Sequence, residues 1–257
     1  MVDYKMIYVL IPTYNREKFL PQAIESVLKQ DHDDFKIIIY DDGSTDNTLR
    51  ILKEYKLKYR HKFILLGERK NNGVNYSRNR LLEYAIQSKA DYFVWQDSDD
   101  VSVPGRLKEL EMAIERQKVD ILFSALYFFA DPNMNRKRLL TIDINRYVSR
   151  SGLNNNMSFP TAIFNKRVCS IPFDSSIRKP GGDLVWVSSL IKSKRIKFGY
   201  YDKPIYYLRR HPEIKRKILK EKKRIFYTTD DIDRFKDLGE KFLGQKIEKI
   251  EKVSLQA

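Results

Sequence analysis

The sequence alternates four times between a short apolar run and a stretch whose apolar residues recur with helical spacing. The apolar runs lie at residues 6–11, 35–40, 62–66 and 91–96, and the helical patterns at 17–30, 44–55, 74–87 and 104–117. Continuous apolar runs are typical of strands that are buried on both faces. The sequence therefore predicts an α/β fold with a Rossmann-like, mostly parallel central sheet flanked by helices.

Two of the helical patterns carry local signals at their start. Pro21 falls in the first turn of the first helix, where its missing N–H costs little. In the second pattern, Ser44 or Thr45 can accept hydrogen bonds from free backbone amides and is predicted to cap the helix.

The alternation weakens after Asp120. We expect one or two strands at 120–129, a strand at 158–166, a helix at 181–194 and a strand with a basic end at 197–211. Two amphipathic helical stretches follow Pro212. The predicted division is a catalytic-type α/β domain at 1–212 and a basic helical extension at 213–257.

Polar residues follow every strand of the predicted sheet. The four segments are "PTYN" at 12–15, "DDGS" at 41–44, "NNG" at 71–73 and "DSDD" at 97–100. In open α/β sheets, ligands bind beyond the carboxyl ends of the strands, where these loops meet. The sequence thus predicts a polar site, rich in carboxylates, at one edge of the sheet.

The formal net charge of +15 favours an anionic partner, and basic residues are densest at 209–224. Nucleic acid, anionic lipid and nucleotide phosphates would all attract this charge. The strand-end carboxylates would repel the phosphates of a nucleic acid unless a cation bridged them, and no nucleic-acid recognition motif is present. A nucleic-acid-binding protein is therefore the less favoured class.

The single cysteine, Cys169, excludes an intrachain disulfide and fits a reducing compartment. We expect it to be a small packed residue. The sequence has no apolar run long enough for a membrane span and no secretory signal pattern at its start. These features predict a cytoplasmic protein. A basic amphipathic stretch at 213–226 is in addition a candidate for peripheral contact with an anionic membrane, with a solvated helix packed on the domain as the alternative.

Six motifs in order resemble the family 2 glycosyltransferases of the GT-A fold. They are "IPTYNR", "DDGSTDNT", "NNGVNYSRN", "DSDDVSVPGRL", "GGD" and "YLRRH", and they extend over residues 6–211. The resemblance implies transfer of a sugar from a nucleotide-diphosphate donor to a hydroxyl of a glycan, a lipid-linked or another acceptor, with Mn²⁺ or Mg²⁺ and with inversion. It points to synthesis of cell-surface polysaccharide or glycoconjugates.

The acidic segment after the fourth strand is the predicted metal site. Hard cations prefer carboxylate oxygens, and such a cation would neutralise the charge that grows on a departing diphosphate. By resemblance Asp99 is the first candidate ligand, and Asp97 either shares the metal or contacts the ribose. Asp100 is a third candidate ligand, and His211 is a further candidate. The alternative is an acidic N-terminal cap for the helix near Pro104.

The resemblance also assigns residues to the nucleotide sugar. The predicted set is Pro12, Thr13, Tyr14, Asn15, Asp41, Asp42, Asn72, Gly73, Arg78, Asp97, Ser98 and Arg209. Several of these have a structural alternative: Asp41 and Asp42 as caps of the helix after Ser44, Tyr14 as a packed aromatic, and Arg78 as a solvated helix charge. Arg209 would help hold the diphosphate through its fork of donors.

Inversion needs a base that takes a proton from the acceptor hydroxyl. By resemblance that base is Asp183 in "GGDLVWVSSL", with a simple helix cap as the alternative. Gly182 stands where the family commonly has a glutamate, which departs from the pattern. Trp186, one turn on, would stack on a sugar face or be buried in the core.

A sugar-nucleotide-binding module and a nucleotidyltransferase are two other classes of protein that could carry an α/β sheet with a nucleotide site. A non-catalytic sugar-nucleotide-binding module would not need the complete acidic set. A nucleotidyltransferase would be expected to carry a glycine-rich phosphate loop after its first strand, and "IPTYNR" contains no glycine.

Overall fold

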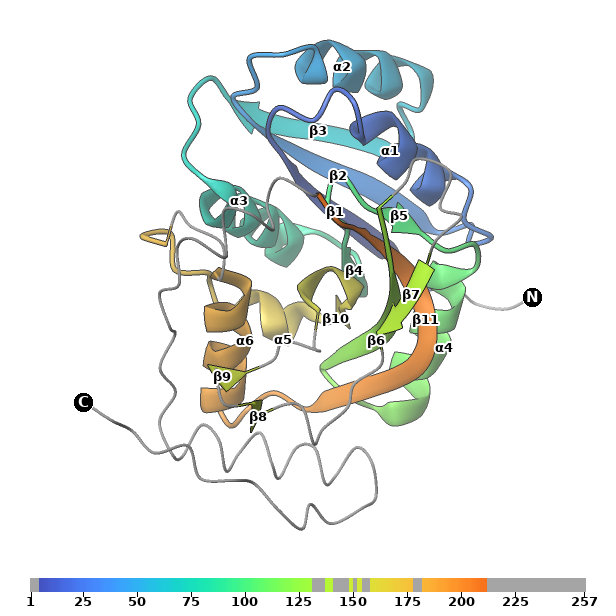
Figure 1. Ribbon diagram of the computed structural model, residues 1–257, viewed down its shortest axis with the longest axis vertical. Helices are drawn as coiled ribbons and strands as arrows, with labels where there is room; N and C mark the ends of the chain where they lie inside the picture. The colour runs from blue at the N-terminus through green and yellow to red at the C-terminus, as the bar shows by residue number, and fades with distance from the viewer. Residues whose placement is uncertain are drawn as a thin grey trace.

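The first half of the chain forms the predicted parallel sheet (Figure 1). The computed structural model describes residues 5–130, 137–140, 148–149, 152–153, 158–177 and 182–211. Strands β1 (Ile7–Thr13), β2 (Phe35–Asp42), β3 (Phe63–Glu68) and β4 (Tyr92–Trp95) lie in the order β3-β2-β1-β4, all parallel. Every residue of β1 is buried, as a central strand requires.

Helices cover both faces of this sheet. The helices are α1 (Leu20–Leu28), α2 (Thr48–Lys58), α3 (Val74–Gln87) and α4 (Arg106–Gln117). Residues of α1, α2 and α4 share one buried cluster with one set of strand side chains, and those of α3 pack in the other cluster. The predicted α/β architecture with two covered faces is confirmed.

The second half adds antiparallel strands, so the sheet is mixed. Strand β6 (Ile121–Phe129) runs parallel to β11 (Phe198–Arg209), while the two-residue β10 (Ile163–Phe164) joins β4 to β6 in the antiparallel sense. Strands β5 (Val101–Ser102) and β7 (Lys137–Leu140) are also antiparallel to their neighbours. The antiparallel strands are short, so most paired positions of this sheet are parallel. A separate hairpin pairs β8 (Val148–Ser149) with β9 (Gly152–Leu153).

Two boundaries differ from the prediction. The second helix begins at Thr48, because Ser44 is used by Asp41 and Asn15 and does not cap it. The strand expected at 158–166 is reduced to β10, because Phe159–Thr161 form a 3₁₀ turn with Pro160 in its first turn. The turn is followed by the short helix α5 (Lys166–Cys169) and later by α6 (Gly182–Lys192).

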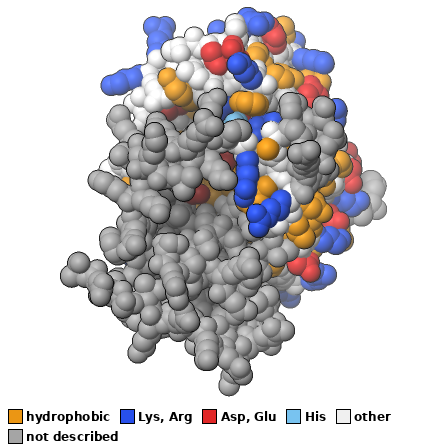
Figure 2. All heavy atoms as spheres, in the orientation of Figure 1, with side chains coloured by type: hydrophobic (Ala, Val, Ile, Leu, Met, Phe, Trp, Pro, Cys, Tyr) orange, Lys and Arg blue, Asp and Glu red, His pale blue; other side chains and the backbone are white. Residues whose placement is uncertain are grey.

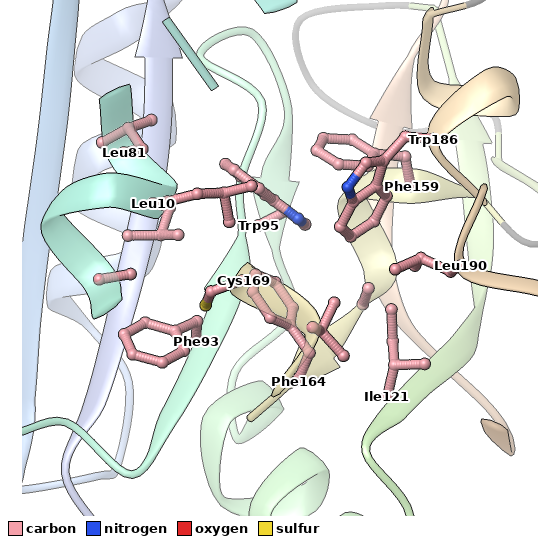
Figure 3. Close-up of a cluster of buried hydrophobic side chains, with 14 of the residues drawn as sticks. Leu10, Leu81, Phe93, Trp95, Ile121, Phe159, Phe164, Cys169, Trp186 and Leu190 are labelled. Atoms are coloured by element: carbon pink, nitrogen blue, oxygen red, sulfur yellow. The ribbon is translucent and has the colours of Figure 1, made fainter. Parts of the chain in front are cut away.

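An aromatic cluster joins the two halves of the fold (Figure 3). Trp186 of α6 is fully buried, stacks on Phe173 at 4.6 Å between ring centroids, and donates its Nε1–H to the Ile171 carbonyl. Trp95 at the end of β4 contacts both Phe159 and Trp186. Burial therefore accounts for Trp186, and the alternative of a sugar-stacking side chain is wrong.

The packing of Cys169 leads to a testable expectation. Its side chain is 3% exposed, and burial raises the pKa of its thiol to about 12. Because the thiolate is the reactive form, Ellman's reagent should modify this thiol only after unfolding in guanidinium. The chain has one cysteine, so the signal is unambiguous. Stoichiometric reaction in native buffer would contradict the packing.

The predicted extension at 213–257, including the membrane candidate at 213–226, lies outside the described residues. Within the part that the structure describes, no helix is both long enough and apolar enough to cross a bilayer.

Candidate active site

The loops after the strands meet at one edge of the sheet, as the sequence predicts. Asn15 contacts the loop after β2, where the Thr45 backbone N–H donates to Asn15 Oδ1 at 2.8 Å. Asp99, after β4, binds Arg16 from the β1 loop and His211 from the end of β11. Segments far apart in the sequence thus form one polar surface beyond the carboxyl ends of the strands.

The loop after β1 is held by hydrogen bonds to the loop after β2, and its Tyr14 side chain is exposed. Asn15 has a φ of 50°, and its backbone N–H donates to Ser44 Oγ, so its side chain and backbone both serve the loop. Tyr14 is 38% exposed, which excludes the alternative of a fully packed aromatic. The Thr13 hydroxyl is buried without a hydrogen-bond partner, and Pro12 is buried in β1. A ligand at this loop can reach the exposed Tyr14 ring.

Asp41 and Asp42 are both buried at the end of β2. Asp42 accepts backbone N–H bonds from Asn72 at 3.0 Å and Gly73 at 2.8 Å, so it holds the start of α3 and not the helix after Ser44 that the capping alternative names. Asp41 accepts hydrogen bonds from the Ser44 hydroxyl and N–H. Burial raises the pKa of both carboxyls despite these bonds. Both aspartates shape the loops, and their contact with a nucleoside stays a prediction.

A buried network fixes the acidic segment after β4. Gln96 donates from Nε2 to the carbonyl oxygens of Asp97 at 3.0 Å and Asp100 at 3.1 Å, which closes the loop. Its Oε1 accepts from Arg106 at 2.9 Å, and Arg106 also donates to the carbonyls of Trp95 and Pro160. Arg106 is fully buried, so the positive charge of α4 lies directly behind the carboxylates.

Asp97 and Asp99 face different partners. Asp97 Oδ1 lies 3.9 Å from Arg78 Nη2, and burial together with the neighbouring acids Asp99 and Asp183 raises the pKa of Asp97 to about 6. Burial opposes ionisation of Asp99 as well, but a hydrogen bond from His211 and the charge of Arg16 outweigh it and lower the pKa of Asp99. Asp99 Oδ2 lies 2.8 Å from His211 Nε2 and 3.4 Å from Arg16 Nε.

Asp100 and Arg209 are turned into the protein. Asp100 accepts the Arg209 backbone N–H at 2.7 Å, and burial raises its pKa well above the usual range. The Arg209 guanidinium donates to the Asp99 carbonyl and to Gln22, and it lies over the Phe19 and Phe129 rings. These contacts anchor the end of β11 to the acidic loop. The predicted roles of Asp100 at a metal and of Arg209 at a diphosphate stay predictions, as does that of the buried Ser98.

Arg78 is buried, so the alternative of a solvated helix charge is wrong. Its guanidinium lies 4.1 Å from the centre of the Phe159 ring and 5.3 Å from that of Phe173. The charges of Asp97 and Asp183 both act on it, against a burial that lowers its pKa.

Asp183 lies in the first turn of α6 and is partly exposed. Its charge acts on both Arg78 and Asp97, so the predicted base and the predicted metal site belong to one electrostatic cluster. The structure thus brings together the acids that the sequence placed some eighty residues apart.

Three residues of this site are not predicted by the sequence motifs. Arg16 is the last residue of the motif "IPTYNR", so its place in the loop after the first strand was the signal that could have identified it. Arg106 looked like an ordinary first-turn residue of a helix, and Gln96 like the end of a strand. The roles of Arg106 and Gln96 depend on contacts between distant parts of the sequence, which no local sequence pattern predicts.

The residues fit a divalent cation of the kind that completes its coordination with phosphate and water. Asp97 and Asp99 supply carboxylate oxygens, and His211 lies against Asp99. Among the described residues, no three or more His, Cys, Asp or Glu side chains form a complete metal cage. Mg²⁺ sites often use one or two carboxylates together with substrate phosphates. The raised pKa of Asp97, caused by burial and by nearby acids, also marks a place where a cation would relieve repulsion.

The described surface carries both signs of charge. Figure 2 shows Lys and Arg side chains interspersed with acidic and apolar ones on one face of the molecule. Among the described residues that this view colours, Lys and Arg form no single basic patch of the kind expected for nucleic acid.

Curated relatives align with less than half of this chain. The putative glycosyltransferase EpsE of Bacillus subtilis (strain 168) is 36% identical over 112 residues, which cover 44% of this chain and 39% of EpsE. The poly(ribitol-phosphate) beta-N-acetylglucosaminyltransferase TarS of Staphylococcus aureus (strain Mu50 / ATCC 700699) is 34% identical over 116 residues, covering 44% of this chain and 20% of TarS. The aligned regions cover less than half the length of either relative.

Solved structures share the fold over nearly the whole chain. The crystal structure of S. aureus TarS 1–349 in complex with UDP-GlcNAc has a TM-score of 0.64 at 18% identity, and the match covers 94% of this chain and 73% of that one. The mannosyltransferase PcManGT from Pyrobaculum calidifontis, in complex with GDP-Man and Mn²⁺, has a TM-score of 0.63 at 14% identity, covering 92% and 68%. These likenesses confirm the predicted GT-A fold.

The family model described as Glycosyl transferase family 2 matches residues 8–178, more than half of the chain. The matched region contains the loops after β1, β2 and β4 and the start of α3, which together form the polar edge described above. The chain therefore belongs to glycosyl transferase family 2.

Proposed function

We propose that the chain transfers a sugar, with inversion, from a nucleoside-diphosphate sugar to an acceptor hydroxyl, with Mn²⁺ or Mg²⁺ bound at Asp97 and Asp99. The observation that carries the proposal is the cluster of Asp97, Asp99 and Asp183 with Arg78 at the carboxyl edge of the sheet. Family membership and the GT-A fold support it. So do the ligands named for the structural neighbours, UDP-GlcNAc and GDP-Man.

The nucleoside would lie over the loops after β1 and β2. Tyr14 offers an exposed ring for the base, and Thr13 a buried hydroxyl that has no hydrogen-bond partner among the described residues. Asp42 holds Asn72 and Gly73 in place, so this loop is already shaped before a ligand binds. A preshaped loop lowers the entropy that binding costs.

The diphosphate would lie beside Asp97 and Asp99, where cationic side chains are available. Arg16 is partly exposed, so its guanidinium can turn from Asp99 towards a phosphate. His211 lies beside Asp99, and Arg78 lies beside Asp97. When bound, the divalent cation supplies positive charge for the leaving diphosphate.

Asp183 would act as the base. Its carboxylate accepts the proton of the acceptor hydroxyl while the hydroxyl oxygen forms the new bond to the anomeric carbon, and the diphosphate leaves from the other side of the sugar. Attack opposite the leaving group inverts the anomeric carbon. The base must therefore stand across the sugar from the acidic loop.

The acceptor is proposed to be a glycan or lipid-linked saccharide of cell-surface polymer synthesis. The names of several relatives point to this class, among them TarS and the putative teichuronic acid biosynthesis glycosyltransferase TuaG of Bacillus subtilis (strain 168). The basic segment 213–226 would bring the enzyme to an anionic membrane surface, where lipid-linked acceptors lie.

Nucleotide binding is the first test. UDP or GDP with Mn²⁺, at one hundred times its Kd, should stabilise the protein by about 2.7 kcal/mol. In a chain of this size that is an increase in Tm of roughly 5–10 °C. Asp99→Ala should lose the part of this increase that depends on Mn²⁺, and Asp202→Ala, at an exposed carboxylate of β11, should retain it. An unchanged Tm with UDP, GDP and TDP would contradict the proposal.

A further inference from the structure

The first turn of α3 touches the segment that leads towards Asp183. Asn75 is 1% exposed, and its Nδ2 donates to the carbonyl oxygens of Asp174 at 3.0 Å and Ile177 at 3.1 Å. Its Oδ1 accepts from Arg78 Nη1 at 3.2 Å. Both amide protons and the amide oxygen are thus used, which fixes the orientation of the side chain.

The same side chain lies against the start of α6. A Cβ added to Gly182 would lie 2.2 Å from Asn75 Nδ2 and 2.8 Å from its Cγ and Oδ1. No real side chain tolerates such distances, so position 182 accepts only glycine while Asn75 keeps its three hydrogen bonds. Gly182 directly precedes Asp183, so this contact constrains the position of the backbone that carries the Asp183 side chain.

A second amide on α3 fastens the same segment. Asn79 Oδ1 accepts the Phe173 N–H at 2.8 Å, and Asn79 Nδ2 donates to the Phe173 carbonyl at 2.9 Å. Two side chains one helical turn apart therefore hold residues 173–177 against α3. Arg78, between them in sequence, faces Asp97 across the site.

We propose that Asn75 and Gly182 are a matched pair of positioning residues that sets the distance between Asp183 and the donor side of the site. Asn75 binds both residues 174–177 and Arg78 through hydrogen bonds. The absence of a Cβ at Gly182 lets the start of α6 lie against the Asn75 side chain. The inference rests on the proposed function, because it assigns to Asp183 the role of base.

A double-mutant cycle tests the contact. Gly182→Ala should lower kcat for transfer by about 10- to 100-fold, because an error of about 1 Å in the position of a reacting group costs this much. The donor KM should rise by less than kcat falls, because the donor loops after β1 and β2 are untouched and Asn75 reaches the donor side through its hydrogen bond to Arg78. In the Asn75→Ala background, where the clash is absent, Gly182→Ala should cost less than about twofold in kcat.

Two further variants separate packing from hydrogen bonding. Asn75→Asp keeps the shape but replaces two N–H donors by a carboxylate oxygen facing two carbonyls, so it should lower kcat at least as much as Asn75→Ala. Tyr76→Phe is the matched control in the same turn of α3, because it removes one hydrogen bond, to Glu68, on the side facing β3. It should leave kcat unchanged.

Amide hydrogen exchange of residues 171–183 provides a readout that needs no substrate. Exchange should accelerate in Asn75→Ala, Asn75→Asp and Gly182→Ala and stay unchanged in Tyr76→Phe. Multiplicative losses of kcat in the double variant, or unchanged exchange in all variants, would overturn the proposal. If the wild type transfers no sugar from any donor, the proposed function fails, and the exchange rates alone then decide whether Asn75 holds the segment.

Discussion

Asp183→Asn should lower kcat for sugar transfer by about 10²–10⁴-fold, the contribution typical of a positioned general base. The amide has nearly the same shape as the carboxylate but cannot take the proton of the acceptor hydroxyl. Nucleotide binding should be retained, because the donor loops after β1 and β2 are untouched. The charge of Asp183 raises the pKa of Asp97, so its removal leaves Asp97 at least as ionised and as able to bind a cation.

The measurement compares initial rates of product formation with the Tm increase caused by UDP or GDP with Mn²⁺. Asp202→Asn, on the exposed side of β11, is the matched control and should transfer at the rate of the wild type. Normal transfer by Asp183→Asn would show that another group takes the proton and that the base assignment is wrong.

Arg106→Met should lower the free energy of unfolding by at least about 3 kcal/mol, because each buried acceptor left without a donor costs about 1–3 kcal/mol. Arg106 donates to four such acceptors: Gln96 Oε1, Ser102 Oγ, and the carbonyl oxygens of Trp95 and Pro160. Methionine fills a similar volume but donates to none of them, although Gln96 Oε1 keeps the Ser102 hydroxyl as a donor. Since Gln96 closes the acidic loop, this variant should also weaken Mn²⁺-dependent nucleotide binding.

Urea denaturation of the variant and of Arg50→Met measures this effect. Arg50 pairs with Glu54 on the surface of α2, with both side chains mostly exposed, so its loss should cost less than about 1 kcal/mol. Burial lowers the pKa of Arg106 to about 10, which shows that its charge is itself unfavourable in the core. A loss as small as that of Arg50→Met would mean that relief of this charge cancels the hydrogen bonds.

The order of strands and helices was predictable because its signals are local. Apolar periodicity placed β1 to β4 and α1 to α4, and the polar segment after each strand marked the edge where the loops meet. The second half was harder. The strand β10 has only two residues, and its place between β4 and β6 depends on pairing with both, which its own sequence does not encode.

The roles of individual site residues were less predictable, because long-range contacts decide them. Arg209 is expected at a diphosphate, but its contacts with Gln22, Phe19 and Phe129 could not be predicted from the sequence. Arg78 is buried because Phe159 and Phe173 come from the second half of the chain. A sequence motif gives the chemistry of a residue, whereas its partners in space give its orientation.

The central claim is that Asp97 and Asp99 bind a divalent cation that supports departure of a nucleoside diphosphate. The most direct measurement is release of UDP from UDP-GlcNAc and of GDP from GDP-Man, with and without Mn²⁺, by the wild type and by Asp99→Ala. If Asp99 binds the cation, the wild type should release nucleoside diphosphate from at least one donor in the presence of Mn²⁺. Asp99→Ala should release none above background. Release that persists in Asp99→Ala, or that is equal with and without Mn²⁺, would contradict this claim.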